Sequence, residues 1–164
     1  GVEHQVLFAG DIDKYVKKAY FANYNMEQTE WHNDVTTFDA KPYEGKIDVL
    51  IGGSLVSHSQ QSETLGFEDT RGTLFFEYAR VLNECKPEAF IFENVKNILY
   101  HDGGRTFKVI LDTFKSLGYN VSYKVLNAVD YGIPQVRNRV FVVGFKNHSI
   151  NYEFPDPQPL TLTV

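Results

Sequence analysis

The sequence predicts an α/β fold assembled from βαβ units. Apolar runs of strand length alternate with longer segments of helical spacing, and polar or glycine-rich residues follow three of the predicted strands. Those residues are Asp11, the pair Gly52–Gly53, and Glu93. Because ligands bind at the carboxyl ends of strands in open α/β sheets, these positions predict one site at a single edge. A length of 164 residues fits one domain with a sizeable core.

The N-terminal half is predicted to hold two strands and two helices. An apolar run over 4–9 predicts a short strand that ends at Asp11, and helical spacing predicts a helix over 14–23. The run over 47–51 predicts a buried strand that opens into the glycine pair. Residues 73–85 carry apolar side chains at helical spacing and predict the second helix.

The C-terminal half repeats this alternation. Residues 89–92 predict a strand, and 106–117 predict a helix that Gly118 ends, as glycine commonly does after a last helical turn. The final strands are expected over 121–126 and 140–145.

The composition is that of an ordinary globular protein, with 43% hydrophobic and 23% charged residues. No apolar run approaches the roughly 20 residues of a membrane-spanning helix. The single cysteine, Cys85, excludes an internal disulfide, is expected to serve packing, and favours a reducing, cytoplasmic setting. With a net charge of −5 and no Lys/Arg cluster, the chain either binds no nucleic acid or lacks the parts that grip phosphates.

One acid, Asp11, is a candidate for binding a nucleoside. Asp11 lies between a strand and a helix, where a carboxylate can accept hydrogen bonds from ribose hydroxyls, or can cap the helix instead. Asp34, from the residues alone, is expected to be a turn residue. The glycine pair either lets the backbone pass close to a ligand or makes a tight turn.

The other candidates lie later in the chain. Glu93 places a carboxylate at a predicted strand exit, where the alternative is an exposed loop acid. Gln135, Arg137 and Arg139 are spaced two apart, so on a strand they would share a face, and paired guanidinium groups suit phosphate or carboxylate recognition; the alternative is surface arginines. No metal is expected, because the loop histidines His58 and His101 lack partners at ligand spacing.

Four segments together resemble the catalytic domain of DNA cytosine-5 methyltransferases. They are Asp48-Val-Leu-Ile-Gly-Gly53, Gly66-Phe-Glu-Asp-Thr-Arg-Gly-Thr-Leu-Phe-Phe-Glu77, Phe92-Glu-Asn-Val95 and Tyr131-Gly-Ile-Pro-Gln-Val-Arg-Asn-Arg139. The resemblance implies a Rossmann-like, mostly parallel sheet with helices on both faces and an antiparallel last strand. It implies S-adenosylmethionine as cofactor.

The resemblance also assigns roles to residues. Glu93 would bind the polar edge of a flipped-out cytosine and stabilise charge when C6 is attacked. Arg137 would contact the target nucleotide and Arg139 would support the site, with Asn94 and Gln135 as further DNA contacts. Asp11 would bind the cofactor ribose and Asp34 the adenine amino group. The other cofactor contacts implied are Ile12, Val35, Gly53, Leu55 and Leu74.

The resemblance covers nearly the whole chain but implies missing parts. The chain begins at Gly1 without an initiator Met and is interpreted as an internal fragment. Residues 1–150 are expected to form a partial catalytic domain that lacks the family's first strand and its Phe-x-Gly-x-Gly loop. Residues 151–164, which include several prolines, are expected to be a linker toward an absent target-recognition domain. These absences would explain the negative charge.

The loop after Gly53 departs from the family. A Pro-Cys-Gln loop there supplies the thiolate that adds to C6 of the base. This chain has Leu55, Val56 and Ser57 instead, and Val56 stands where the cysteine is expected. Valine cannot add to the base, and no base is visible that would activate a neighbouring serine. As written, the chain is not expected to methylate DNA.

A change of reading frame would explain this loop. A coding sequence typical of the family would encode Gly-Phe-Pro-Cys-Gln-Pro-Phe-Ser-Thr-Val-Gly here. If one base is lost from its second codon, translation in the shifted frame gives Gly-Ser-Leu-Val-Ser-His-Ser-Gln-Gln-Ser. That is the sequence of residues 53–62. The hypothesis places the shift either in the gene, which would be a decayed enzyme, or in the determined sequence. Codons for 53–63 that cannot be re-read in this way would exclude it.

The functional expectation is methyl transfer to C5 of cytosine in DNA by a bacterial- or phage-type restriction–modification enzyme. Its partners would be double-stranded DNA with a flipped cytosine and a cognate restriction endonuclease. One alternative is a catalytically dead remnant or non-catalytic subunit. Another is a plain nucleotide-binding Rossmann module. The sequences of residues 93–95 and 135–139 argue against that alternative.

Overall fold

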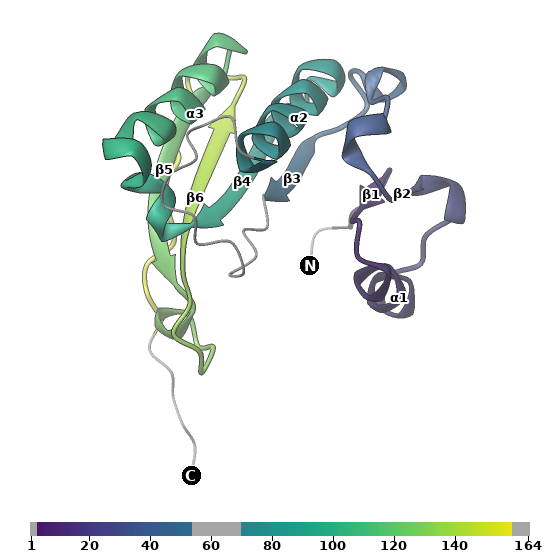
Figure 1. Cartoon of the computed structure of the whole chain (residues 1–164), viewed down its shortest axis with the longest axis horizontal. Coiled ribbons are helices and arrows are strands. Elements are labelled where there is room, and N and C mark those ends of the chain that lie inside the picture. Colours follow the sequence, from purple (N-terminus) through teal and green to yellow (C-terminus); the bar gives the residue numbers. More distant parts are fainter. Residues whose placement is uncertain (1–2, 54–69, 159–164) are drawn as a thin grey trace.

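The larger part of the molecule is a four-stranded sheet covered on one face by two helices (Figure 1). The computed structural model describes residues 3–53 and 70–158. In spatial order the strands are β3 (Val49–Gly53), β4 (Ala89–Val95), β6 (Asn138–Phe145) and β5 (Asn120–Asn127). The helices are α2 (Thr70–Cys85) and α3 (Arg105–Ser116).

Strand directions agree with the expected topology. β3 pairs with β4 in parallel, whereas β6 runs antiparallel to both of its neighbours, β4 and β5. The prediction of an antiparallel last strand is therefore confirmed. The sheet is consequently parallel in direction for β3, β4 and β5, with β6 inserted between the last two in the opposite sense.

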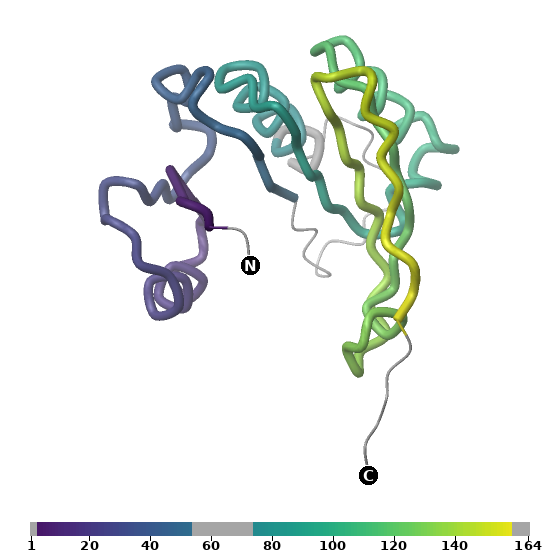
Figure 2. Tube along the Cα trace, turned by 180° about the vertical axis from the view of Figure 1, so that it is seen from behind, coloured from purple at the N-terminus to yellow at the C-terminus, as the bar shows by residue number. Residues whose placement is uncertain are grey.

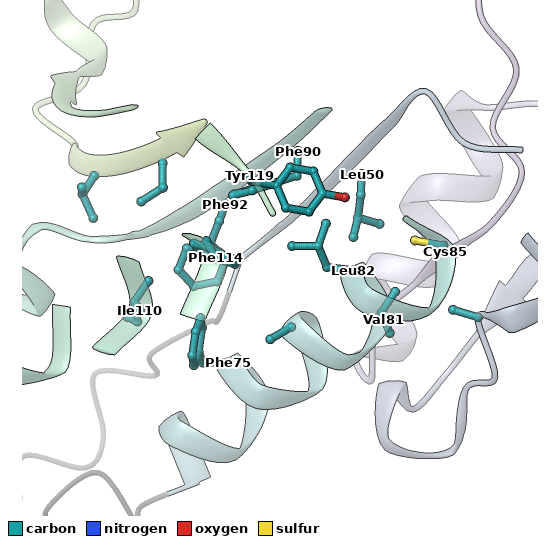
Figure 3. Close-up of a cluster of buried hydrophobic side chains, with 14 of the residues drawn as sticks. Leu50, Phe75, Val81, Leu82, Cys85, Phe90, Phe92, Ile110, Phe114 and Tyr119 are labelled. Atoms are coloured by element: carbon teal, nitrogen blue, oxygen red, sulfur yellow. The ribbon is translucent and has the colours of Figure 1, made fainter. Parts of the chain in front are cut away.

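The core lies between the sheet and the two helices (Figure 3). Successive residues of β4 alternate between partly exposed and buried, so Phe90 and Phe92 point toward the helices. Phe114 of α3 packs against Phe90 with ring centroids 4.4 Å apart and meets Phe92 edge to face at 5.6 Å. Leu82 of α2 is fully buried beside them. This apolar layer fixes β4, the strand that carries Glu93.

A smaller unit lies beside β3, on the side away from β5 (Figures 1 and 2). It contains β1 (Ala9–Gly10), α1 (Lys14–Asn23) and β2 (Trp31–His32), and its two strands pair in parallel. Only Ala9 of the predicted strand 4–9 is in β1, and β2 was not predicted, because two residues are too short for a periodic signal. Short 3-10 turns, among them η2 (Val35–Thr37) and η3 (Lys41–Tyr43), lead from β2 toward β3.

The sheet is divided into two pieces. Among the described residues β1 pairs with β2 alone and β3 with β4 alone, so one side of each strand carries no neighbour. On the exposed face of β3, Ile51 is 71% exposed. That the chain lacks the family's first strand stays a prediction. A further parallel strand could pair with the open side of β3.

The two faces of the larger sheet are covered differently. The tail returns along the face away from α2 and α3 (Figure 2), where the Asn120 side chain donates to the carbonyl of Ile150 and Tyr131 donates to Pro155. Between residues 151 and 157 the tail has no regular element, as its prolines predicted. No helix in the described part of the chain is long and apolar enough to cross a membrane.

Candidate active site

Glu93 lies within β4, because this strand continues to Val95, beyond the predicted end at residue 92. The expectation that Glu93 follows the end of this strand is therefore wrong. The side chains of Glu93 and Asn94 point to opposite faces of the sheet. Asn94 is 3% exposed on the helix-covered face, where its side-chain oxygen accepts a hydrogen bond from Val95 N at 2.8 Å. That placement gives Asn94 a structural role; its direct contact with DNA stays a prediction.

The Glu93 carboxylate is held by an arginine from the neighbouring strand. Arg139 of β6 places Nε 2.8 Å from Glu93 Oε1, and Arg137 places Nη2 3.8 Å from the same oxygen. The Arg139 side chain is 20% exposed and that of Arg137 46%. Glu93 and Arg139 therefore form a half-buried ion pair, while Arg137 stays available to solvent.

The grouping of 135, 137 and 139 on one strand face is only partly right. β6 begins at Asn138, so Gln135 and Arg137 lie in the preceding loop, where strand alternation does not apply. The Arg137 amide donates to the side chain of Asn127 at 3.0 Å, which positions the loop. Arg137 and Arg139 still converge on Glu93, whereas Gln135 is exposed and shows no contact with that carboxylate.

Gly53 provides the space in which the Glu93 side chain lies. The two residues are register partners on β3 and β4. A Cβ on Gly53 would be 2.7 Å from the Glu93 carbonyl oxygen and 2.9 Å from Oε2. Sequence reasoning treated Gly53 as a cofactor contact or turn residue and missed this function, because the partner strand is 40 positions away (93 − 53). The cofactor contact of Gly53 stays a prediction.

The two acids predicted to bind the cofactor follow β1 and β2. Asp11 Oδ1 accepts a hydrogen bond from Asp13 N at 2.8 Å, and Asp13 is the residue that caps α1. Asp34 caps η2 and accepts from the backbone and the hydroxyl of Thr36 at 2.9 and 2.8 Å. These bonds lower the pKa of Asp34, which favours its carboxylate form.

Because β1 and β2 are parallel neighbours, both acids lie at the same end of that sheet. The local bonds do not exclude a ligand, since a carboxylate has acceptor sites on both oxygens. An acid at each of two neighbouring strand ends suits a ribose and an amino group, so the residues fit the adenosine part of the cofactor.

The remaining predicted site residues are scattered. Ile12 is 86% exposed, Leu74 on α2 is also exposed, and Val35 packs partly buried at the edge of the core. Leu55, Val56 and His58 lie outside the described residues. The interpretation of Cys85 as a packing residue is confirmed, because it is fully buried and burial raises the pKa of its thiol to about 11.

Sequence reasoning also missed Arg80 on α2. Its guanidinium donates to two backbone carbonyls of the segment that follows Asp34. The only available signal was the spacing of Glu77, Arg80 and Glu84, which places three charges on one helix face.

Comparison with known proteins assigns the family. The family described as C-5 cytosine-specific DNA methylase matches residues 1–162. The chain is 47% identical over 157 residues to the Type II methyltransferase M1.ScrFI of Lactococcus lactis subsp. cremoris, covering 94% of this chain and 39% of that protein. It is 44% identical over 158 residues to M.SsoII of Shigella sonnei, covering 94% and 41% respectively.

Solved structures agree in fold. A DNA modification methyltransferase encoded within an E. coli prophage superimposes with a TM-score of 0.70 at 23% identity, covering 94% of this chain and 46% of that one. The S. pombe Dnmt2 methyltransferase gives a TM-score of 0.65 at 19% identity, covering 92% and 44%. The α/β methyltransferase fold is thus confirmed. The chain spans less than half the length of these relatives, and it belongs to the C-5 cytosine-specific DNA methylase family.

Proposed function

We propose that the protein containing this chain transfers a methyl group from S-adenosylmethionine to C5 of cytosine in DNA, within a restriction–modification system. The observation that carries the proposal is the Glu93 carboxylate, held 2.8 Å from Arg139 beside Gly53, in a chain whose family match spans residues 1–162. Its target would be a flipped cytosine in double-stranded DNA, and a cognate endonuclease would cut the unmodified sequence. The setting would be the cytoplasm.

In this proposal the side chains act on the base. Glu93 accepts or donates a hydrogen bond at the polar edge of the extruded cytosine and stabilises the charge that develops on attack at C6. Arg139 orients the carboxylate through their ion pair. Arg137 is more exposed and 3.8 Å from Glu93, so it can turn toward the target nucleotide, for which a guanidinium is suited.

Asp11 and Asp34 would bind the adenosine part of the cofactor through its ribose hydroxyls and its amino group. Ile12, Val35 and Leu74 would supply apolar contacts. When bound, S-adenosylmethionine supplies the methyl group. Residues 151–164 would lead to a target-recognition domain, which would also supply most of the contacts to phosphates.

A second candidate is favoured by Val56, which stands at the position of the expected nucleophile. A protein that truly carries valine there cannot form a bond to C6, so it would bind the cofactor without transferring the methyl group. It would then be a decayed enzyme or a non-catalytic subunit.

One peptide distinguishes the two candidates. Trypsin cuts after Lys46 and Arg71, so the mass and fragmentation of the peptide 47–71 report the loop directly. Pro-Cys-Gln in this peptide predicts transfer of labelled methyl to DNA by the complete protein, reduced about 100-fold or more in Glu93→Gln but not in the surface variant Glu88→Gln. Leu55-Val56-Ser57 predicts cofactor binding without transfer. A protein that neither binds the cofactor nor methylates DNA would contradict both candidates.

A further inference from the structure

Arg80 connects α2 to the turn that follows Asp34. Its Nη2 donates to the carbonyl of Val35 at 2.7 Å, and its Nη1 donates to the carbonyl of Phe38 at 2.9 Å. Val35 begins the 3-10 turn η2, and Phe38 is the residue that ends it. One guanidinium therefore holds both ends of a single turn.

The guanidinium is itself fixed by two acids of the same helix. Glu77 accepts from Nε at 2.8 Å, and Glu84 accepts from Nη1 at 2.9 Å. The Glu84 oxygen also accepts from the Ala40 amide at 3.0 Å, so the acid contacts the same segment as the arginine. The planar, multi-donor fork of arginine is required here, because the single ammonium of lysine cannot reach four acceptors in fixed directions.

The 3-10 turn η2 also fixes the Asp34 side chain. Asp34 Oδ1 accepts from Thr36 N and Thr36 Oγ1, and the Asp34 carbonyl accepts from Thr37 Oγ1 at 3.1 Å. The direction of the carboxylate is thus set by the backbone of residues that Arg80 holds. Moving the Val35 carbonyl would move the Thr36 amide, since the two belong to one peptide unit.

We propose that Arg80 is a positioning residue for the adenine side of the cofactor site, acting through the turn 35–38 on the Asp34 carboxylate. The inference rests on the proposed function, in which Asp34 accepts a hydrogen bond from the adenine amino group. It goes beyond that function by assigning ligand selectivity to a helix residue that touches no ligand.

Packing makes the effect separable from unfolding. Phe38 is 8% exposed and stacks on Phe8 at 4.7 Å and on His32 at 4.1 Å. These contacts keep the segment beside β1 and β2 when Arg80 is replaced. Loss of Arg80 therefore loosens the turn while the aromatic contacts of the segment persist.

The test compares S-adenosylhomocysteine with its analogue that carries unsubstituted purine, which differs only in that hydrogen replaces the adenine amino group. Calorimetry on the full chain gives the preference of wild type, Arg80→Met and Arg80→Lys. We expect the preference of both variants for the adenine ligand to fall about tenfold. A change of this size corresponds to the loss of one charge-assisted hydrogen bond. Lys86→Met is the matched control, because Lys86 directly follows α2 and its 2.7 Å ion pair with Glu44 is lost while the turn 35–38 stays intact.

Hydrogen exchange without ligand gives an independent readout. In Arg80→Met the amides of Thr36, Thr37 and Phe38 should exchange faster, while those of β4 stay unchanged. An unchanged preference, or equal weakening for both ligands, overturns the inference and leaves the proposed function standing. A complete wild-type protein that binds neither ligand overturns the proposed function and the inference with it.

Discussion

At the scale of single residues, a side chain added at Gly53 should destabilise the fold, because Gly53 lies close to Glu93. Gly53→Ala would place a methyl group 2.7 Å from the Glu93 carbonyl oxygen and 2.9 Å from its carboxylate, so one strand must shift. We expect a loss of about 1–3 kcal/mol in the free energy of unfolding, measured with urea.

A double-mutant cycle tests the cause. In Glu93→Ala the contact with Oε2 is gone but the contact with the carbonyl remains, so Gly53→Ala should cost less in that background than in the wild type. Equal costs in the two backgrounds would show that the carboxylate does not lie over Gly53.

His32 should make stability depend on pH. Its Nε2 is the one buried side-chain nitrogen or oxygen of the described chain without a hydrogen-bond partner, and desolvation lowers the pKa of the ring from 6.5. The unfolded state therefore binds a proton before the folded state as the pH falls. The contribution of His32 is complete above about pH 6.5 and is lost as the pH falls toward the lowered value.

The comparison variant is His32→Phe, which keeps a ring against Phe38 and cannot be protonated. The free energy of unfolding of the wild type, relative to this variant, should fall between about pH 7.5 and about pH 5. Parallel pH curves for the two proteins would contradict an unprotonated His32 with a buried Nε2.

At the scale of elements, the contact of α3 with the sheet depends on one aromatic side chain. Phe114 is fully buried and contacts the rings of Phe75, Phe90 and Phe92. We expect Phe114→Ala to cost about 3–5 kcal/mol in urea unfolding, since it leaves a cavity among rings. Phe76 is 46% exposed, and Phe76→Ala is the matched control with a much smaller loss. Equal losses would mean that α3 is not packed on β4.

The same scale shows what local sequence can predict. Helix α1 was predicted with its observed bounds, Lys14–Asn23, because its signal is a period within ten residues. The extension of β4 from residue 92 to Val95 was missed, because it depends on pairing with residues 139–141 of β6. Local propensity carries no information about a partner so distant in sequence.

For the candidate site too, contacts between elements distant in sequence were the part that was not predicted. The family resemblance assigned Glu93, Arg137 and Arg139 to one site, and the ion pair between Glu93 and Arg139 brings two of them together, while their catalytic roles stay predictions. The space above Gly53 and the hold of Arg80 on Val35 were not predicted. Both are contacts between elements, and a single sequence shows neither the distance nor the direction of such contacts.

At the scale of the whole molecule, the candidate site residues are divided between two sheets. Glu93 and Arg139 lie on the larger sheet, with Arg137 in the loop before β6, whereas Asp11 and Asp34 follow the two strands of the smaller sheet. The proposed catalytic and adenosine-binding residues are therefore divided between sheets that share no strand pairing in the described chain. A strand between them would join base and cofactor sites into one rigid edge, as the family resemblance leads us to expect.

Thiol chemistry on the intact protein then decides whether the molecule is an enzyme or its remnant. The sequence holds one cysteine, Cys85, which is fully buried and whose pKa is raised by burial to about 11. Because thiolate is the reactive form, a disulfide reagent should label no thiol at neutral pH in the folded protein and one after unfolding in urea.

A protein with the family's Pro-Cys-Gln loop would differ in both counts. It would hold a second cysteine, giving two labelled thiols after unfolding, and a nucleophile open to its substrate would react before unfolding. Protection by bound target DNA would identify that thiol as the nucleophile. If Cys85, the last residue of α2, reacts in the folded chain, then its burial does not hold in solution, and the packing described for this helix is wrong.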